Sequence, residues 1–293
     1  MRLWTILPDE KLTDDRAYLL GCLKGVFDDV EAAWVSRMGG DLKEASRPPD
    51  VILNLVSAHS RDLLDRINAL AARYGVPLSP NSEAAWRTED KRTYLDDYPD
   101  VIPPTRIARD MTAIEAALAD FGGDIVVKDP FGMRGENSER IASANDLEIA
   151  RRMFAQSICG EQSLVVQPYL SGFTKGDKRI ILQRSPRDDF EVIGHYMRKP
   201  PPGGWKSNIR NGGLMLRAEI TTAEREMALD IAARTGMDHV GLDLASHDGR
   251  LYYIEHNQGY GGIIDFDLDR GVRNVARCAE FLYHLAKHGR PDT

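Results

Sequence analysis

Residues 239–262, HVGLDLASHDGRLYYIEHNQGYGG, constrain the fold of this chain most strongly. Val240, Leu242 and Leu244 alternate with smaller or polar residues, a polar cluster follows at 246–249, and a second apolar run begins at Leu251. Period-two alternation on both sides of a polar turn is typical of a β-hairpin. We therefore predict two antiparallel strands that are joined at 246–249.

Three oxygen-bearing side chains fall on this hairpin. Side chains alternate between the faces of a strand, so Glu255 and Asn257 point the same way, and any register that pairs Asp243 with an odd-numbered residue adds it to that face. Carboxylate and amide oxygens suit Mg²⁺ that bridges nucleotide phosphates. The pattern predicts a metal site of Asp243, Glu255 and Asn257, and the alternative is a solvated face with scattered polar residues.

Length and composition limit the class of protein. A chain of 293 residues with 42% hydrophobic residues can bury a large core, and its size fits two compact units better than one. The formal net charge of −7 argues against a general nucleic-acid-binding protein. Cys22, Cys159 and Cys278 are isolated, which favours neither zinc nor disulfides. With no signal-peptide pattern and no apolar segment near the roughly 20 residues that cross a bilayer, we expect a cytoplasmic protein without a membrane partner.

The first 80 residues have the pattern of a small parallel α/β unit. Apolar runs at 3–7 and 51–56 predict buried strands, and helices are expected at about 14–26 and 61–73. Strand, helix, strand, helix is the order that gives a parallel sheet with crossover helices.

A second unit is predicted from residue 81, where a charged helical stretch begins. Glu224 is placed for a capping box at the start of the last predicted helix. The strands are expected at 124–128, 163–169, 178–183 and 190–197, and the helices at 111–120, 144–154 and 221–235.

The two commonest nucleotide-binding fingerprints, Walker A and GxGxxG, do not occur in the chain. Lys128 instead ends a predicted strand just before a loop that contains Gly132 and Gly135. Backbone amides in such a loop can approach phosphate oxygens while the ammonium group supplies positive charge. Lys91 can add a second cation, although either lysine taken alone is more often an exposed surface cation.

Two arginine-bearing segments follow. Asp177 and Arg179 share one face of a strand, where the arginine can stabilise a transferred phosphoryl group or form a surface ion pair.

The second segment, RKPPPGGWKSNIRNGG at 198–213, has the composition of a loop. Its basic residues Arg198, Lys206 and Arg210 suit an anionic substrate, and the alternative is a solvated basic loop.

Taken together, these segments resemble the ATP-grasp ligases, and most closely the bacterial glutathione synthetase branch, which includes the ribosomal-protein glutamate ligases. The resemblance runs from about Asn81 to Asp267 and rests on five motifs in order. They are DIVVKDPFGMRGE, VVQPYL, GDKRIIL, RKPPPGGWKSNIRNGG, and HVGLDLA with YIEHNQ.

The resemblance implies an α/β (α+β) ATP-grasp fold in three parts. A small parallel-sheet domain on the substrate side would occupy 1–80, a lid and central subdomain 81–170, and an antiparallel-sheet subdomain with the metal and substrate site 171–293.

The resemblance also implies a role for each matching residue. Arg179 and Arg198 would face the transferred phosphoryl group, while Asp243, Glu255 and Asn257 would hold two Mg²⁺ ions, for which Mn²⁺ can substitute. The ATP-binding residues would be Lys91 and Lys128 at the phosphates, Gly132, Met133 and Gly135 in the lid, and Gln167, Pro168, Tyr169, Leu170 and Asp177 around adenine and ribose. The substrate-facing residues would be Lys206, Asn208, Arg210, Gly212, Gly213, Gln258, Gly259 and Tyr260.

The activity implied is that of an ATP-dependent, ADP-forming carboxylate-amine ligase. It would make an amide bond on a small amino acid or peptide through an acylphosphate. Its substrates would be a small-molecule carboxylate and an amine, with no nucleic acid as a partner, and the chain would form a homodimer or higher homo-oligomer. The alternatives are a ligase that modifies a peptide or protein, by adding glutamate or closing a macrocycle, and a nucleotide-binding or phosphotransfer protein without ligase activity. The chain departs from glutathione synthetases at 204–206 and 258–262, both in the substrate-facing part.

Overall fold

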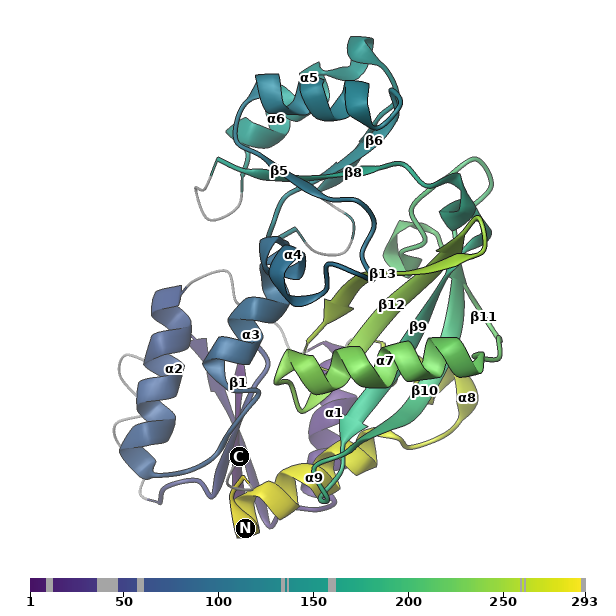
Figure 1. Cartoon of the computed structure of the whole chain (residues 1–293). Coiled ribbons are helices and arrows are strands. Elements are labelled where there is room, and N and C mark those ends of the chain that lie inside the picture. The colour runs from purple at the N-terminus through teal and green to yellow at the C-terminus, as the bar shows by residue number, and fades with distance from the viewer. Residues whose placement is uncertain are drawn as a thin grey trace.

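The structure is a computed structural model of the whole chain. It describes residues 1–8, 13–35, 47–56, 61–132, 135, 137–157, 162–258, 260 and 262–290. Three sheets organise these residues, and Figure 1 shows them as separate layers, with the second sheet at the top and the N-terminal sheet at the lower left.

The N-terminal sheet, sheet A, is parallel throughout and has the order β2-β1-β3-β4. Its strands are β1 (Arg2–Leu7), β2 (Asp29–Trp34), β3 (Val51–Asn54) and β4 (Leu78–Ser79), and its helices are α1 (Asp14–Lys24) and α2 (Arg61–Tyr74). The parallel α/β unit is therefore confirmed. Strand β2 lies outside the predicted elements because it is a half-exposed edge strand that begins with charged residues.

Sheet B is antiparallel and has the order β5-β8-β6-β7. Two helices cover one face of it, as Figure 1 shows. The strands are β5 (Arg106–Ala108), β6 (Ile125–Lys128), β7 (Ser138–Ile141) and β8 (Leu164–Pro168), and the helices are α5 (Met111–Asp120) and α6 (Glu148–Ala155). These elements have a core of their own, which includes Ile114, Val127, Ile141 and Val166.

Sheet C is antiparallel, with the order β11-β10-β9-β12-β13. Its strands are β9 (Asp177–Arg184), β10 (Phe190–Lys199), β11 (Leu214–Leu216), β12 (His239–His247) and β13 (Arg250–Asn257). Helix α7 (Thr222–Thr235) lies across the sheet in Figure 1 and starts with the predicted capping box of Thr221 and Glu224. The hairpin closes through Asp248 and Gly249, which both have positive φ, as a tight two-residue turn requires.

The remaining helices join the sheets. They are α3 (Ser82–Glu89), a 3₁₀ turn η3 (Lys91–Thr93), α4 (Tyr94–Asp97), α8 (Ile263–Arg270) and α9 (Val275–His288), with shorter 3₁₀ turns η4 (Ala144–Asp146), η6 (Ser171–Lys175) and η7 (Ile209–Asn211). None of the helices in the described ranges is both long and apolar enough to span a membrane.

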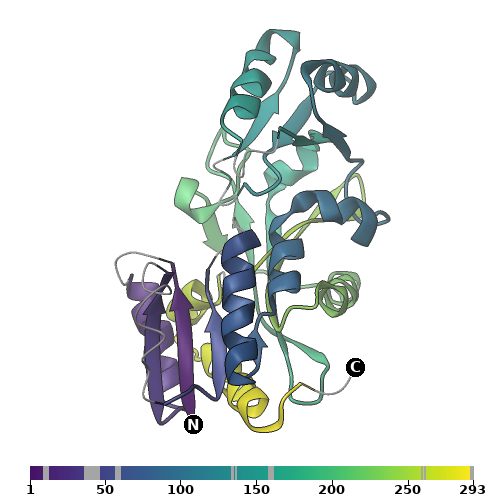
Figure 2. The same ribbon diagram turned by 90° about the vertical axis from the view of Figure 1, so that its left-hand side faces the viewer.

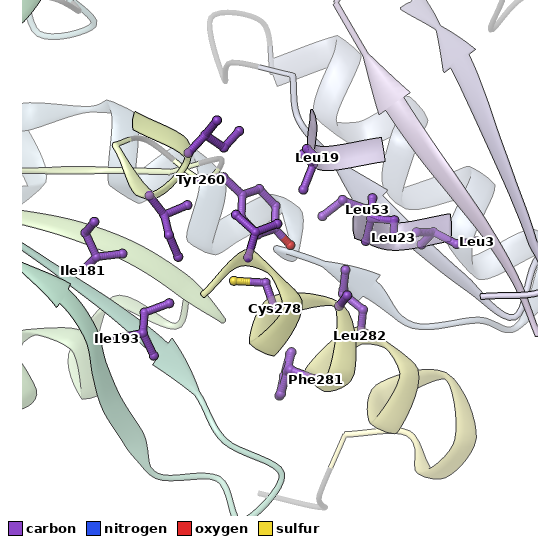
Figure 3. Packing of buried hydrophobic residues seen from close by; sticks show 14 of the residues in the cluster. Leu3, Leu19, Leu23, Leu53, Ile181, Ile193, Tyr260, Cys278, Phe281 and Leu282 are labelled. Atoms are coloured by element: carbon purple, nitrogen blue, oxygen red, sulfur yellow. The ribbon is translucent and has the colours of Figure 1, made fainter. Parts of the chain in front are cut away.

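One hydrophobic cluster connects sheet A to sheet C. Figure 3 shows Leu3 and Leu53 of sheet A on one side, Ile181 and Ile193 of sheet C on the other, and Leu282 of α9 with them. The view in Figure 2 shows the same helix beside the strands of sheet A. The chain therefore returns to its N-terminal unit after completing sheet C.

A second cluster places α3 and α4 on sheet C, through Ala84, Tyr94 and Tyr98 against Ile180 and Tyr253. Residues 82–102 thus pack with sheet C, while sheet B begins only at β5. The boundaries predicted at 80/81 and 170/171 stay predictions.

Candidate active site

The hairpin register brings the predicted metal ligands together. Asp243 pairs with Glu255, and Gly241 pairs with Asn257, so the odd-numbered side chains share one face of β12 and β13. A bulge follows, since Leu244 pairs with Tyr253 and leaves Ile254 as the extra residue. The Nδ2 atom of Asn257 lies 3.5 Å from Asp243 Oδ2.

The registers of β9 with β10 and of β9 with β12 place a row of charged side chains across sheet C. Arg198 of β10 is the cross-strand partner of Asp177 on β9, and Arg179 on β9 is that of Asp243 on β12. Opposite charges that face each other across strands attract. Both pairs are doubly hydrogen-bonded: Arg179 Nε and Nη2 each donate to Asp243 at 2.7 Å, and Arg198 Nε donates to Asp177 Oδ1 at 3.0 Å. These contacts agree with the prediction that Asp177 and Arg179 lie on the same face of their strand.

Asp243 is the centre of this row. Its side chain is 0% exposed, and its Oδ2 also lies 2.6 Å from Arg198 Nη2. Burial alone raises the pKa of a carboxyl group, but the two guanidinium groups outweigh it and hold the pKa of Asp243 below its ordinary value. Asp243 is therefore a fixed carboxylate, already neutralised by two arginines.

Glu255 differs from Asp243 in its surroundings. Its side chain is partly exposed, and within the described part of the chain it belongs to no ion pair. Glu255, Asp243 and Arg198 all line one pocket. Of the two acids, Glu255 keeps its charge available to a cation.

The pocket lies between sheets B and C. It encloses about 880 Å³ of space free of protein atoms, part of it open to solvent, which falls in the range of roughly 300–1,000 Å³ usual for ligand pockets. The lining runs from the end of β8, through Lys128 on β6, to the charged row on sheet C. One end is thus mostly uncharged and the other strongly charged.

Lys128 stands between these two ends. Its Nζ donates to Gln167 Oε1 at 2.9 Å, and Gln167 Nε2 donates to Thr105 Oγ1 at 2.9 Å. Burial lowers the pKa of Lys128 to about 8, against an opposing pull from the Glu255 carboxylate and with help from the nearby Lys91 ammonium. The lysine thus stays mostly protonated at about pH 7 and loses its proton at a lower pH than an exposed lysine does.

The glycine-rich loop contacts the loop at 198–213. Lys206 Nζ donates to the Gly135 carbonyl at 2.8 Å and lies 3.4 Å from Glu139 Oε1. A Cβ on Gly135 would stand 2.4 Å from Asn208 Oδ1, and the residue has φ +72°, so only glycine fits. The ring of Trp205 meets Tyr169 edge-on at 6.3 Å. These contacts join two loops that both line the pocket.

The opposite face of the hairpin is anchored in aromatic packing. His256 stacks on Tyr94 with ring centroids 5.0 Å apart and is hydrogen-bonded to the Tyr253 hydroxyl. Burial lowers the pKa of His256 to about 3, so the ring is neutral. This packing fixes the strand that carries Glu255 and Asn257.

Most predicted site residues line the pocket. They are Lys128, Gly132, Gly135, Gln167, Pro168, Tyr169, Leu170, Asp177, Arg198, Lys206, Asn208, Asp243 and Glu255. Lys91, Arg179, Asn257, Gly212, Gly213, Gln258 and Tyr260 are not among its lining residues. Met133, Gly259, Cys159 and the side chain of Arg210 lie outside the described residues.

Three of the residues outside the lining have identifiable surroundings. Lys91 Nζ donates to the Gly132 carbonyl and supports the glycine-rich loop. Arg179 contacts Asp243, as described above. Tyr260 is buried and stacks on His239 with centroids 4.7 Å apart, in the cluster between sheets A and C. Their roles toward a ligand stay predictions.

Some lining residues were not predicted although the sequence carries a signal for them. Val126 lies two positions before Lys128 on β6, and Ser138 is the cross-strand partner of Lys128. Period two from Lys128 would place Val126 on the pocket face. Pro103 and Phe173 come from connecting segments and have no such pattern.

Comparison with known proteins places this site in a family. Residues 91–254, more than half of the chain, match the family described as the ATP-grasp domain of prokaryotic glutathione synthetase. The glutathione synthetase of Mesorhizobium japonicum is 32% identical over 198 residues, which cover 67% of this chain and 58% of that protein. The glutathione synthetase of Rhodopseudomonas palustris is 28% identical over 233 residues, covering 78% of this chain and 66% of that protein. The chain thus spans less than two thirds of the length of these curated relatives.

Solved structures agree on the fold. A RimK domain ATP-grasp protein from Sphaerobacter thermophilus superposes with a TM-score of 0.73 at 16% identity, over 96% of this chain and 99% of that one. D-alanyl-alanine synthetase A from Vibrio cholerae superposes with a TM-score of 0.74 at 13% identity, over 98% of both chains. The fold of the chain is that of the ATP-grasp proteins, as predicted. With residues 91–254 matching the family's own domain, the chain belongs to the prokaryotic glutathione synthetase ATP-grasp family.

Proposed function

We propose that the chain is an ATP-dependent, ADP-forming carboxylate-amine ligase that makes an amide bond on a small amino acid or peptide. The observation that carries the proposal is the pocket between sheets B and C, whose lining joins the Gln167–Leu170 segment, Lys128, Arg198, Asp243 and Glu255 in one cavity. Family membership supports the same reaction class. In this reaction a substrate carboxylate attacks the γ-phosphate of ATP, ADP leaves, and an amine displaces phosphate from the acylphosphate.

The donor set fits Mg²⁺, which prefers oxygen ligands and usually keeps several waters. Among the described residues, the Glu255 carboxylate belongs to no ion pair, and Asp243 Oδ1 accepts one hydrogen bond, from Arg179 Nε. Asn257 would add its amide oxygen only after the amide turns over, since its Nδ2 faces Asp243 Oδ2 in this structure. When bound, the ion would neutralise charge on the ATP phosphates.

The cations of the pocket would act on the phosphates directly. Arg198 lines the pocket from sheet C and Lys128 lines it from sheet B, so a polyphosphate between the sheets would meet positive charge on both sides. Fixed charges in a site of low dielectric stabilise charge that develops in a transition state. Arg179 would act through Asp243 by holding its carboxylate in place.

The lid contact would protect the acylphosphate from water. Lys206 and Asn208 meet Gly135 over the pocket, so a bound nucleotide would lie beneath two loops that touch. Exclusion of water prevents hydrolysis of a labile intermediate.

An ADP-release assay tests the proposed function. The purified chain, supplied with ATP and Mg²⁺, should release ADP faster when mixtures of amino acids and dipeptides are added, and mass spectrometry should detect an amide product. Absence of stimulation by every mixture, or ADP release without an amide, would contradict the proposal. A mass increase on a co-expressed peptide or protein would instead identify a macromolecular substrate.

Lys128 predicts a pH dependence of ATP binding. The protonated lysine attracts phosphate, so affinity should fall as the pH rises through its pKa of about 8. Binding at about pH 9 should be about tenfold weaker than at about pH 7, because only about a tenth of the lysine is still protonated at the higher pH. Isothermal titration calorimetry with a non-hydrolysable ATP analogue measures this.

The variant Lys128→Arg is the control, because arginine keeps its charge across this range and the affinity of this variant should not change with pH.

Folding stability should change with pH in the opposite direction to ATP affinity. The pKa of Lys128 is lower in the folded than in the unfolded chain, so its contribution to the free energy of unfolding rises between about pH 8 and 10.4. An affinity of the unmodified chain that stays flat from about pH 7 to 9 would contradict the assignment of Lys128.

A further inference from the structure

Trp205 is an aromatic residue of the pocket that the phosphate chemistry does not require. It lines the space between sheets B and C and lies in the 198–213 segment, at one of the two places where the chain departs from glutathione synthetases. Its side chain is partly buried, so part of the indole surface stays accessible. Tryptophan offers a large, rigid aromatic face that favours stacked or edge-on aromatic neighbours. A flat ligand group suits such a face.

Trp205 lies beside Tyr169 at the uncharged end of the pocket. The centroids of the two rings are 6.3 Å apart, and their planes meet at 85°. A planar group that stacks on the indole therefore turns its edge toward Tyr169. Leu170, the next residue in the chain, and Val126, which pairs with Gln167, also line the pocket and are apolar. Tyr169 and Trp205 thus form an aromatic corner in apolar surroundings.

Both rings of the aromatic corner are held in place. The guanidinium carbon of Arg140 lies 3.6 Å from the centroid of Tyr169, and Arg140 donates two hydrogen bonds to Asp124 at 2.8 and 2.6 Å. On the other side, Lys206 Nζ donates to the glycine-rich loop and lies 5.3 Å from the centroid of Trp205. Groups that are ordered before a ligand binds lower the entropy cost of binding.

The position of the charges sets the direction in which a nucleotide would lie. Its phosphates would lie between Lys128 and Arg198, next to the carboxylates of the charged row. These residues and the aromatic corner line one cavity, so the base of the same nucleotide would reach the uncharged end. A reacting carboxylate or amine must instead lie near the γ-phosphate, at the charged end. The aromatic corner is therefore placed for the base.

We propose that Trp205 stacks on the nucleobase and makes the pocket prefer a purine over a pyrimidine nucleotide. The inference rests on the proposed function, because it concerns the nucleotide that the ligase uses. Stacking of a base on an aromatic side chain contributes about 5- to 150-fold in affinity, and a purine has two fused rings to stack where a pyrimidine has one. A contact that only fastens the loop to sheet B would also explain the Trp205–Tyr169 pair, but it predicts no dependence on the base.

Calorimetry on the full chain with Mg²⁺ at about pH 7 separates these two roles. The ligands are ADP, CDP and inorganic tripolyphosphate, which has phosphates and no base, and no other substrate is added. The unmodified chain should bind ADP at least about fivefold more tightly than CDP. Trp205→Ala should weaken ADP binding at least about tenfold, weaken CDP binding less, and leave tripolyphosphate binding unchanged.

Two further variants control for packing. Trp205→Phe keeps an aromatic face, so its affinity for ADP should stay within about threefold of that of the unmodified chain. In the unmodified chain ADP should change the tryptophan fluorescence, and this change should be absent in Trp205→Phe. Trp34→Ala removes another partly buried tryptophan, at the end of β2 and outside the pocket lining, and should leave all three affinities unchanged.

The contrary results differ in what they overturn. The inference is wrong if Trp205→Ala binds ADP as tightly as the unmodified chain, or if the variant weakens tripolyphosphate binding as much as ADP binding. In either case the proposed function stands as long as the unmodified chain binds ADP. If the unmodified chain binds no ADP, both fail. If the base preference and its loss in Trp205→Ala are observed but no amide forms, the ligase function fails while the role of Trp205 stands.

Discussion

Replacing Glu255 by alanine is expected to reduce Mg²⁺-dependent ADP release by more than about a hundredfold, because residues that merely orient metal ligands already contribute about 10- to 100-fold. Glu255 lines the pocket and, in the described part of the chain, no cation neutralises it in an ion pair. Asp243, its cross-strand partner, is shared between two arginines. Removing Glu255 would therefore remove the more available carboxylate of the site.

The loss should be specific to activity. Glu255 is partly exposed, so Glu255→Ala should change the free energy of unfolding in urea by about 1 kcal/mol or less. Glu255→Gln should lose activity nearly as completely, since the amide is neutral.

Asp248→Asn is the control for the Glu255 variants. It is also a carboxylate-to-amide change on the hairpin, at a turn position with φ 49° that asparagine tolerates. It should retain full activity. Unchanged ADP release in Glu255→Ala would remove this residue from the metal site.

The hairpin shows how much of the candidate site can be predicted from the sequence alone. The alternation of Val240, Leu242 and Leu244 predicts the strand, and a side-chain period of two predicts that Asp243 and Glu255 share a face once the register is odd. Both are local properties of two strands joined by a short turn. For this reason they can be inferred without knowledge of the rest of the fold.

The neutralisation of Asp243 could not be predicted in the same way. It depends on β9 lying next to β12 and on the register that places Arg179 opposite Asp243. The two strands are separated by β10, β11 and α7 in sequence, and strand order over such a distance is set by packing of the whole sheet. Arg198 reaches the same carboxylate only because β10 is the other neighbour of β9.

Helix α9 is not among the predicted elements, although its buried residues Val275, Cys278, Leu282 and Leu285 recur at the spacing of a helix. The surface on which it packs, between sheet A and sheet C, could not be inferred from that spacing.

Asp243→Asn is expected to destabilise the chain by about 3–5 kcal/mol, the usual loss when one partner of a buried ion pair is removed. The change leaves Arg179, which is 8% exposed, without the carboxylate that accepts from its Nε and Nη2. Arg198 keeps Asp177 and should suffer less. Urea unfolding at about pH 7 measures the difference.

The effect of pH distinguishes charge from packing in this variant. The pKa of Asp243 is held below its ordinary value, so its ionisation stabilises the fold above the unfolded pKa of about 3.9, and this contribution is lost as the pH falls through the folded pKa. The gap between the unmodified chain and Asp243→Asn should therefore be constant from about pH 5 to 8 and shrink below about pH 4.

A double variant completes the test of the Arg179–Asp243 pair. Adding Arg179→Met to Asp243→Asn removes the unpaired guanidinium group, so the double variant should be more stable than the sum of the single losses predicts, by about 0.5–3 kcal/mol. Strictly additive losses would mean that Arg179 and Asp243 do not stabilise each other, and equal urea midpoints for Asp243→Asn and the unmodified chain would mean that the charged row does not hold sheet C together. A recovery of stability in the double variant, with ADP release still lost, would show that the loss of activity does not come from unfolding of the neighbouring strands.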